Sequence, residues 1–373
     1  MPKYCSPKKT KNKSLSSISC FNKESLINIA KSYNKLYSKS IINIPTKFTN
    51  KGMVQFWKVL KKKISGKTNC SEENCWIETA IGENALLRDN TIKDFLRPLR
   101  PKSWNNDPNE WLSTTDIENV LKQYNVYNDF IFIGAVPIDF DSEMSPGMCV
   151  INELCNIDIE KLYKKGITKI GVVFNLDKHN EPGTHWISLF ISIYKGSIFF
   201  FDSYGNNPNK EISTFIHRVR KMINNLFLKN PKILHKVDID TEIVNKITKI
   251  TKIKKINTHT YTIDKCFQKD TPVFYSNKKI YEPINIVNVD AYLDKYQITT
   301  NVDLPDNAQL IQKGVFVFYN SKRYQFKNSA CGMYSIIFII ELLQNKSIYE
   351  VLKNMNHDDK TEALRDKYFR PNK

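Results

Sequence analysis

The chain lacks the apolar segments that export or membrane insertion requires. Its first residues, MPKYCSPKKTKNKSLSSIS, are polar and basic and hold no apolar core for a signal peptide. The longest apolar stretch runs from Met333 to Leu343, is too short to span a bilayer and is interrupted by Glu341. These absences predict a protein that is neither secreted nor membrane-anchored, with most of its eight cysteines as reduced thiols.

The chain also has no C-x-x-C motif. Cys70 and Cys75, and likewise Cys149 and Cys155, are spaced too widely to resemble zinc knuckles. We therefore expect no metal site, and we expect the cysteines to serve mainly as small buried apolar residues.

Acidic residues are few compared with basic ones. Fifty-six Lys and Arg against 38 Asp and Glu give a net charge of +18, and no acidic residue precedes Glu24. Such an excess attracts polyanions over long distances, although a composition rich in Lys, Asn and Ile, as an AT-rich genome encodes, is the simpler explanation. Residues 1–20 are predicted to form a disordered basic arm, which is either a solvated tail or a non-specific nucleic-acid-binding segment.

The remaining chain divides by composition. Residues 21–103 alternate helix-like stretches with loops, which predicts a mainly helical N-terminal region. A segment rich in Pro, Trp and Asn then marks the boundary to a second domain over 104–373. Within it, residues from about 229 to 312 look like an insertion, with isoleucine at every third position from Ile247 to Ile256. That period fits neither an ideal helix nor a simple strand.

The rest of the second domain has clearer patterns. WLSTTDIENVLKQYN predicts a helix capped by Ser113, Thr114 or Thr115, and NKEISTFIHRVRKMINNLF predicts another. DFIFIGAVPIDF, ITKIGVVFNL and GVFVFYN predict strands, and HWISLFISIYKGSIFFFDSYG predicts a hairpin turning at Lys195-Gly196. The segment CGMYSIIFIIELL is apolar on almost every face, which predicts a buried helix.

Cys331 stands where a polar loop meets this helix. The helix N-terminus favours the thiolate form of a cysteine, and Gly332 keeps the approach open at a cost in helix propensity. A cysteine at a helix start is more often a packing residue than a nucleophile. The interpretation therefore depends on partners elsewhere in the chain.

His185 and Asp202 are candidate partners. His185 begins one strand of the hairpin and Asp202 follows the other, so both should lie at the same end of the sheet. A carboxylate there can accept the imidazole N–H and fix its tautomer, whereas an edge-strand histidine and a turn-capping aspartate are the alternatives. Gln325, six residues before Cys331, can donate to a developing oxyanion beside the Cys331 N–H.

The order of these residues resembles the ubiquitin-like-protein protease family, which includes the SUMO proteases and the adenovirus-type proteases. The resemblance rests on His-Trp, Asp-Ser after a strand, Gln-x5-Cys-Gly opening an apolar helix, and the 17 residues between His185 and Asp202. The block from Lys165 to Gly205 is most similar to thiol proteases of large nucleocytoplasmic DNA viruses. These are mimivirus-type proteins and, more distantly, the African swine fever virus polyprotein protease. The likeness covers roughly residues 104–228 and 313–370.

The resemblance implies an α+β fold with a papain-like cysteine protease core, in which a central mixed sheet packs on a buried helix that starts at the nucleophile. It implies Cys331 as nucleophile, His185 as general base, Asp202 as the residue that orients the base, Gln325 as oxyanion donor, and Trp186 as a wall of a narrow substrate channel. The 129 residues between Asp202 and Cys331 exceed the family's compact core, and the insertion accounts for the excess.

The resemblance also implies a function. It indicates a thiol protease that cleaves viral structural polyproteins, at Gly-Gly-X-like sites, during virion maturation. We then expect it in the virion and in the viral factory of the host cytoplasm, with no cofactor other than DNA as a candidate activator. Three alternatives stay open: a deconjugating protease for ubiquitin- or SUMO-like modifiers, an acetyltransferase, and a basic nucleic-acid-binding or scaffold protein with a degenerate protease fold.

Overall fold

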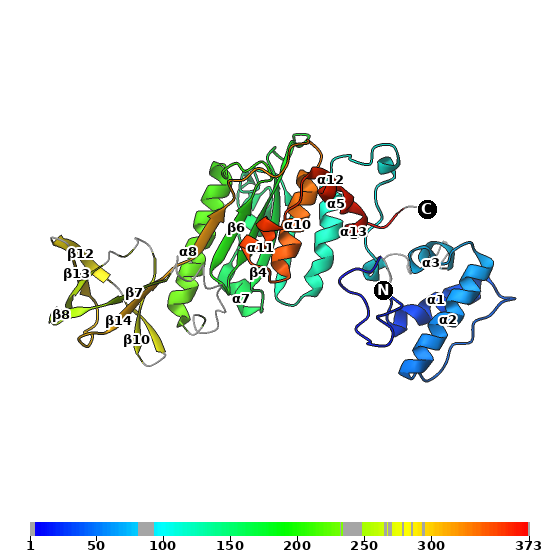
Figure 1. Ribbon diagram of the computed structural model, residues 1–373, viewed down its shortest axis with the longest axis horizontal. Coiled ribbons are helices and arrows are strands. Elements are labelled where there is room, and N and C mark those ends of the chain that lie inside the picture. The colour runs from blue at the N-terminus through cyan, green and yellow to red at the C-terminus, as the bar shows by residue number, and fades with distance from the viewer. Residues whose placement is uncertain are drawn as a thin grey trace. The chain divides into compact units, whose positions relative to one another are not determined.

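The computed structural model describes residues 4–80, 93–231, 233, 248–264, 267, 271–277, 280–284, 286–292 and 295–371 (Figure 1). The chain divides into two compact units, each with its own core. Unit 1 comprises Met1–Tyr127, Lys327–Ile336 and Asn356–Lys373. Unit 2 comprises Asn128–Phe326 and Ile337–Met355.

Unit 2 is built on a mixed five-stranded sheet in the order β1-β4-β5-β6-β15. The strands are β1 (Phe130–Val136), β4 (Lys169–Asn175), β5 (Trp186–Ser192), β6 (Ser197–Phe201) and β15 (Phe316–Tyr319). β5 runs antiparallel to both β4 and β6, β1 runs parallel to β4, and β15 runs parallel to β6. The nearly continuous apolar runs of these strands are typical of a sheet that is buried on both faces.

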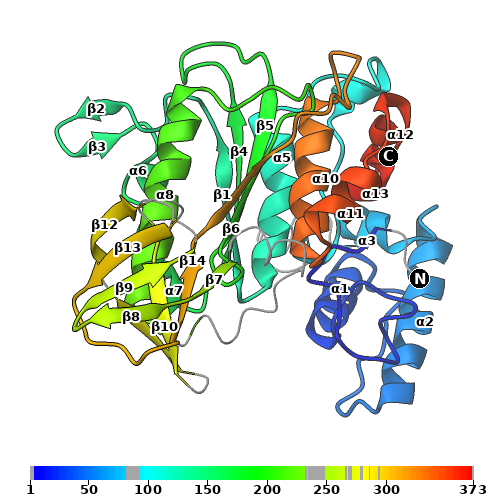
Figure 2. The same ribbon diagram turned by 60° about the vertical axis from the view of Figure 1, so that its left-hand side comes forward.

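Helices cover both faces of this sheet (Figure 2). On one face, α8 (Lys210–Lys229) packs an apolar stripe against alternate residues of the strands, such as Val172 and Leu189. On the other lies the portion of α10 (Cys331–Leu343) that belongs to unit 2, where Phe338 stacks on Phe201 with ring centroids 4.7 Å apart. Shorter elements complete the unit: β2 (Glu143–Ser145), β3 (Met148–Cys149), α6 (Asn152–Cys155), α7 (Ile159–Lys164) and α11 (Ile348–Lys353).

Two four-stranded sheets lie along the chain between α8 and β15, in the orders β11-β10-β14-β7 and β12-β13-β9-β8. Their strands are β7 (Thr248–Lys252), β8 (Lys254–Asn257), β9 (Thr260–Ile263), β10 (Val273–Asn277), β11 (Ile280–Ile284), β12 (Ile286–Tyr292), β13 (Lys295–Thr300) and β14 (Gln309–Lys313). A separate apolar cluster, including Tyr261, Ile298 and Leu310, holds them together. The chain then returns to the central sheet at Val315, whose N–H donates to Asn224 Oδ1 of α8 at 3.2 Å.

The isoleucine row of this segment does not form one buried face. Ile253 is buried, whereas Ile256 is 52% exposed, and Ile247 lies outside the described residues. The row runs through the whole of β7 and into β8, and these two strands belong to different sheets. The three-residue period of the isoleucines therefore does not correspond to one helix or one strand.

Unit 1 has a helical core of its own. Its first part contains α1 (Lys23–Leu36), α2 (Asn50–Lys67) and α3 (Glu73–Ala80), which bury side chains such as Tyr33, Leu60 and Trp76 against one another. The unit also holds η1 (Lys93–Phe95), η2 (Lys102–Asn105), α5 (Thr114–Leu121), η3 (Lys122–Val126), α12 (Asp358–Ala363), α13 (Arg365–Tyr368) and the first residues of α10. α5 begins with a capping box between Ser113 and Asp116, one of the caps that the sequence predicted.

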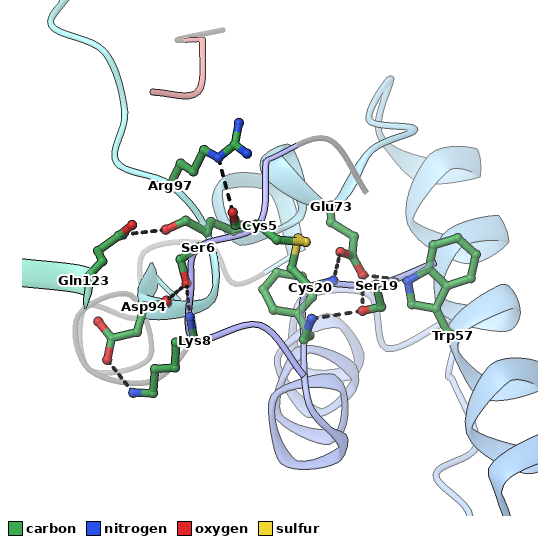
Figure 3. Close-up of a disulfide and its surroundings, with 12 residues drawn as sticks. Cys5, Ser6, Lys8, Ser19, Cys20, Trp57, Glu73, Asp94, Arg97 and Gln123 are labelled. Carbon is green, nitrogen blue, oxygen red and sulfur yellow. Dashed lines mark hydrogen bonds and ion pairs between the residues drawn. A yellow bond between two sulfur atoms is a disulfide. The ribbon is translucent and has the colours of Figure 1, made fainter. Parts of the chain in front are cut away.

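The N-terminal residues pack onto this core. Cys5 is joined to Cys20 by a disulfide, and Arg97 Nε donates to the Cys5 carbonyl at 3.2 Å (Figure 3). Leu15 is fully buried. The prediction of a disordered basic arm over residues 1–20 is therefore wrong for the described residues 4–20. Its lysines are exposed as expected, but Leu15 and the cross-link anchor the segment, and a short segment with isolated apolar residues has no periodicity to reveal this.

Glu73 of α3 joins this segment to the helices (Figure 3). Its buried carboxylate accepts hydrogen bonds from the Ser19 hydroxyl, from the Cys20 N–H at 2.7 Å and from Trp57 Nε1 at 2.6 Å. Burial raises the pKa of Glu73, and the three donors oppose that rise. The carboxylate thus replaces water for three polar groups at once.

Among the residues that the structure describes, six cysteines are paired, which contradicts the prediction of mostly reduced thiols. The pairs are Cys5–Cys20, Cys70–Cys75 and Cys149–Cys155, with Cα–Cα distances of 5.0, 5.8 and 6.3 Å. All three distances lie in the usual range for disulfides. The prediction failed because it inferred reduced thiols from the expected cellular compartment. The compartment does not determine which cysteines the fold brings together.

Candidate active site

His185 and Asp202 meet at one end of the central sheet. β5 starts directly after His185 and β6 ends directly before Asp202, and the two strands pair antiparallel. His185 Nε2 lies 2.7 Å from Asp202 Oδ1, and their side chains are only 7% and 3% exposed. The sequence-based prediction that these two side chains lie together is correct. Since Nε2 contacts the Asp202 carboxylate, Nδ1 is the ring nitrogen that would face a reacting group.

Asp202 is itself held by neighbours that the sequence analysis missed. The Tyr204 N–H donates at 2.9 Å to Oδ1, the same oxygen that His185 contacts. Asn320 is buried and directly follows β15; its Oδ1 accepts from the Asp202 N–H at 2.9 Å, and its Nδ2 donates to the Asp202 carbonyl at 2.7 Å. A signal for Asn320 was present, because it follows the strand GVFVFY as Asp202 follows SIFFF, and these strands are parallel neighbours.

Gln325 is completely buried, and its amide is oriented by Ser203. The Ser203 hydroxyl donates to Gln325 Oε1 at 2.6 Å, and the Gln325 N–H donates to the Ser203 carbonyl at 3.0 Å. The amide oxygen is engaged in this way, and the Nε2 end of the side chain donates to the Tyr204 hydroxyl at 3.5 Å. An oxyanion needs a donor, and Nε2 is the donor end of an amide. Ser203 is therefore a second supporting residue that the sequence analysis left without a role.

Cys331 is the first residue of α10 and is buried, at 1% exposure. It is the free cysteine of the described chain. A Cβ on the next residue, Gly332, would lie 2.9 Å from Leu112 Cβ, so the glycine permits close packing within unit 1. Close packing, rather than an open approach, is thus the structural reason for Gly332.

The structure brings together His185 with Asp202 and Gln325 with Ser203, all within unit 2. Cys331 belongs to unit 1, so its meeting with this group stays a prediction. Trp186 is the first residue of β5 and is 6% exposed; its role as a channel wall also stays a prediction.

The described residues contain no group of three His, Cys, Asp or Glu side chains that could hold a metal ion. In the same part of the chain, every helix is too short or too polar to cross a membrane.

Comparisons with known proteins show what the chain is similar to. No family model matches the chain. A protein of Acanthamoeba polyphaga mimivirus, named "Putative thiol protease", is 32% identical over 213 residues, which cover 53% of this chain and 66% of that protein, just under two thirds of its length. The crystal structure of the African swine fever virus (ASFV) protease superposes with a TM-score of 0.52 at 17% identity, covering 100% of this chain and 97% of that chain. A selenomethionine crystal structure of the same protease gives 0.51 at 15% identity, over 99% and 96%.

The chain shares its fold with the African swine fever virus protease. This confirms the α+β architecture expected from the sequence, with a central mixed sheet and a buried helix that starts at Cys331. It also confirms the resemblance to thiol proteases of large DNA viruses.

Proposed function

We propose that this protein is a cysteine endopeptidase with Cys331 as nucleophile, His185 as base and Asp202 as the residue that orients the base. The observation that carries the proposal is the buried His185–Asp202 pair, with a 2.7 Å contact between Nε2 and Oδ1 at the end of the sheet. Two buried polar groups in such contact fix both the ring orientation and its tautomer. The similarity to a mimivirus protein named as a thiol protease supports the same activity.

The residues can be assigned to the steps of acyl transfer. The Cys331 thiolate attacks the carbonyl carbon, and the new oxyanion accepts hydrogen bonds from Gln325 Nε2 and the Cys331 N–H. The C–N bond breaks as the His185 Nδ1 proton passes to the leaving amine, which leaves a thioester on Cys331. Water then loses a proton to His185 and attacks the thioester, which releases the acid and restores the Cys331 thiolate beside a protonated His185.

We further propose that the substrates are viral structural polyproteins cleaved after Gly-Gly during virion maturation. The support is the virus-encoded relative, together with the resemblance on which the sequence-based expectation rested. Buried Trp186, next to His185, is the side chain that would leave room only for glycine backbone at the cleavage site.

Peptide cleavage tests the activity directly. The purified full chain should cleave a fluorogenic Gly-Gly-X peptide, and Cys331→Ala should abolish cleavage. His185→Gln should also abolish it, whereas the matched control His217→Gln, at an exposed position of α8, should retain it. Equal cleavage by the native chain and Cys331→Ala would refute the proposal. Cleavage of ubiquitin- or SUMO-like conjugates without cleavage of polyprotein peptides would replace the proposed substrate class.

A further inference from the structure

A layer of aromatic and cationic side chains lies on the ring of His185. The Tyr204 ring stacks on the imidazole, with centroids 4.5 Å apart and planes 17° from parallel. The Arg323 guanidinium carbon lies 5.1 Å from the centroid of the Tyr204 ring. Histidine, tyrosine and arginine are therefore successive layers, and all three belong to unit 2.

Arg323 is held firmly but is not neutralised. Its Nε donates to the Gln325 carbonyl at 2.7 Å, and its guanidinium carbon also lies 5.1 Å from the centroid of Phe326. Within the described chain, Arg323 takes part in no ion pair, and its two terminal nitrogens make no hydrogen bond. Two aromatic contacts and one hydrogen bond thus fix the plane of the guanidinium, while its forked end remains available to a ligand.

This arrangement suits a carboxylate. Arginine binds carboxylates through two parallel N–H···O bonds, and restricting its rotamers beforehand reduces the entropy lost on binding. Phe326 lies beside this cation and is 61% exposed. Its ring offers apolar contact to the methylene groups of an acidic side chain.

We propose that Arg323 is a specificity-determining residue that binds an acidic side chain of the substrate, within the first two positions after the scissile bond. This inference rests on the proposed peptidase function. In that function His185 gives its proton to the leaving amine, so the departing segment passes closest to the side chains layered on the imidazole. Tyr204 and Arg323 form those layers.

Paired peptides test this proposal. The peptides carry Gly-Gly before the scissile bond and differ only in Glu or Gln at the first or second position after it. At one of these positions we expect kcat/KM of the native chain to favour Glu by about fivefold to tenfold, since the contact is charge-assisted but partly exposed. Arg323→Gln should bring this ratio to about one, and Arg323→Glu should shift the preference to Lys at the same position.

Lys322→Gln is the matched control. It removes the same charge one residue away, but the Lys322 ammonium lies over Tyr324, 5.1 Å from its centroid, and not over Tyr204. It should keep the Glu preference of the native chain. A Glu preference that survives Arg323→Gln, or a native ratio near one at both positions, would overturn the proposal. An equal loss of kcat for both peptides would instead make Arg323 a positioning residue and would also overturn it.

A binding measurement separates this inference from the proposed function. Fluorescence anisotropy of the same labelled peptides on the Cys331→Ala chain needs no turnover. Tighter binding of the Glu peptide that depends on Arg323 would support the inference even without cleavage, and equal binding of both peptides would count against it. Absence of Cys331-dependent cleavage, by contrast, bears on the peptidase function alone.

Discussion

Replacing Asp202 by Asn probes the geometry of the pair more sharply than replacing it by Ala. Two donors, His185 Nε2 and the Tyr204 N–H, point at the same oxygen of Asp202, at 2.7 and 2.9 Å. If an amide took the place of the carboxylate with its NH2 group in that position, it would face both donors. The substituted side chain is therefore expected to keep its oxygen there, so that His185 retains its acceptor and its tautomer.

The loss in Asp202→Asn should then come from charge alone. A hydrogen bond to a charged group contributes about 1.5–3 kcal/mol, and a neutral one about 0.5–1.5 kcal/mol. A difference of about 1–2 kcal/mol corresponds to a decrease in kcat/KM of about fivefold to thirtyfold. Asp202→Ala removes the acceptor and leaves both donors unsatisfied, which should cost about 3–4 kcal/mol, or a hundredfold to thousandfold.

Steady-state cleavage of a Gly-Gly-X peptide by the three proteins measures these ratios, with thermal unfolding to verify that each is folded. Asp139→Asn is the control, because Asp139 also contacts a histidine, His179, at 2.6 Å but at a more exposed position. It should leave kcat/KM unchanged. A loss of about ten-thousandfold in Asp202→Asn, as expected when an amide forces the wrong tautomer, would refute the reasoning.

Three further predictions concern stability and charge. Burial lowers the pKa of Lys313 from 10.5 to about 8, so the cost of burying its charge is fully present below pH 8 and falls as pH rises toward 10.5. In urea titrations, Lys313→Met should therefore raise the unfolding free energy by about 1–3 kcal/mol at pH 7 and by less at pH 10. An equal gain at both pH values would contradict this. Glu73→Ala should lower the unfolding free energy by about 2–4 kcal/mol, because three donors lose their acceptor. Urea titration measures this loss, and an unchanged urea midpoint would contradict it. Residues 1–80 carry sixteen lysines against four glutamates, a net charge of +12, so we expect non-specific DNA binding that weakens steeply between 50 and 200 mM salt in anisotropy measurements; binding that is insensitive to salt would exclude this electrostatic origin.

The sequence predicted those features that depend on local patterns. The hairpin placed His185 and Asp202 together because antiparallel strands with a short turn bring their outer ends to one edge. The apolar runs predicted strands and a buried helix because burial on both faces leaves no polar alternation.

Features that depend on contacts between distant segments could not be predicted in this way. Asn320 lies 118 residues after Asp202, and only the pairing of β15 with β6 makes them neighbours. The same limit applies to residues 4–20, whose order depends on Glu73 and on the pairing of Cys5 with Cys20. Single-sequence periodicity contains no information on such pairings.

The return of the chain at Val315 has a consequence for how this protein can change. The amide of Val315 bonds to Asn224 of α8, the helix after which the chain departs, so both junctions of the intervening segment are tied to one helix. Loop-closure entropy grows slowly with length, and a segment of about eighty residues costs only about 2 kcal/mol more than one of ten. Evolution can therefore lengthen, shorten or exchange this intervening segment. Asn320 and Gln325, which follow β15, would keep their contacts with Asp202 and Ser203. New binding surfaces can be acquired there without rebuilding the chemistry.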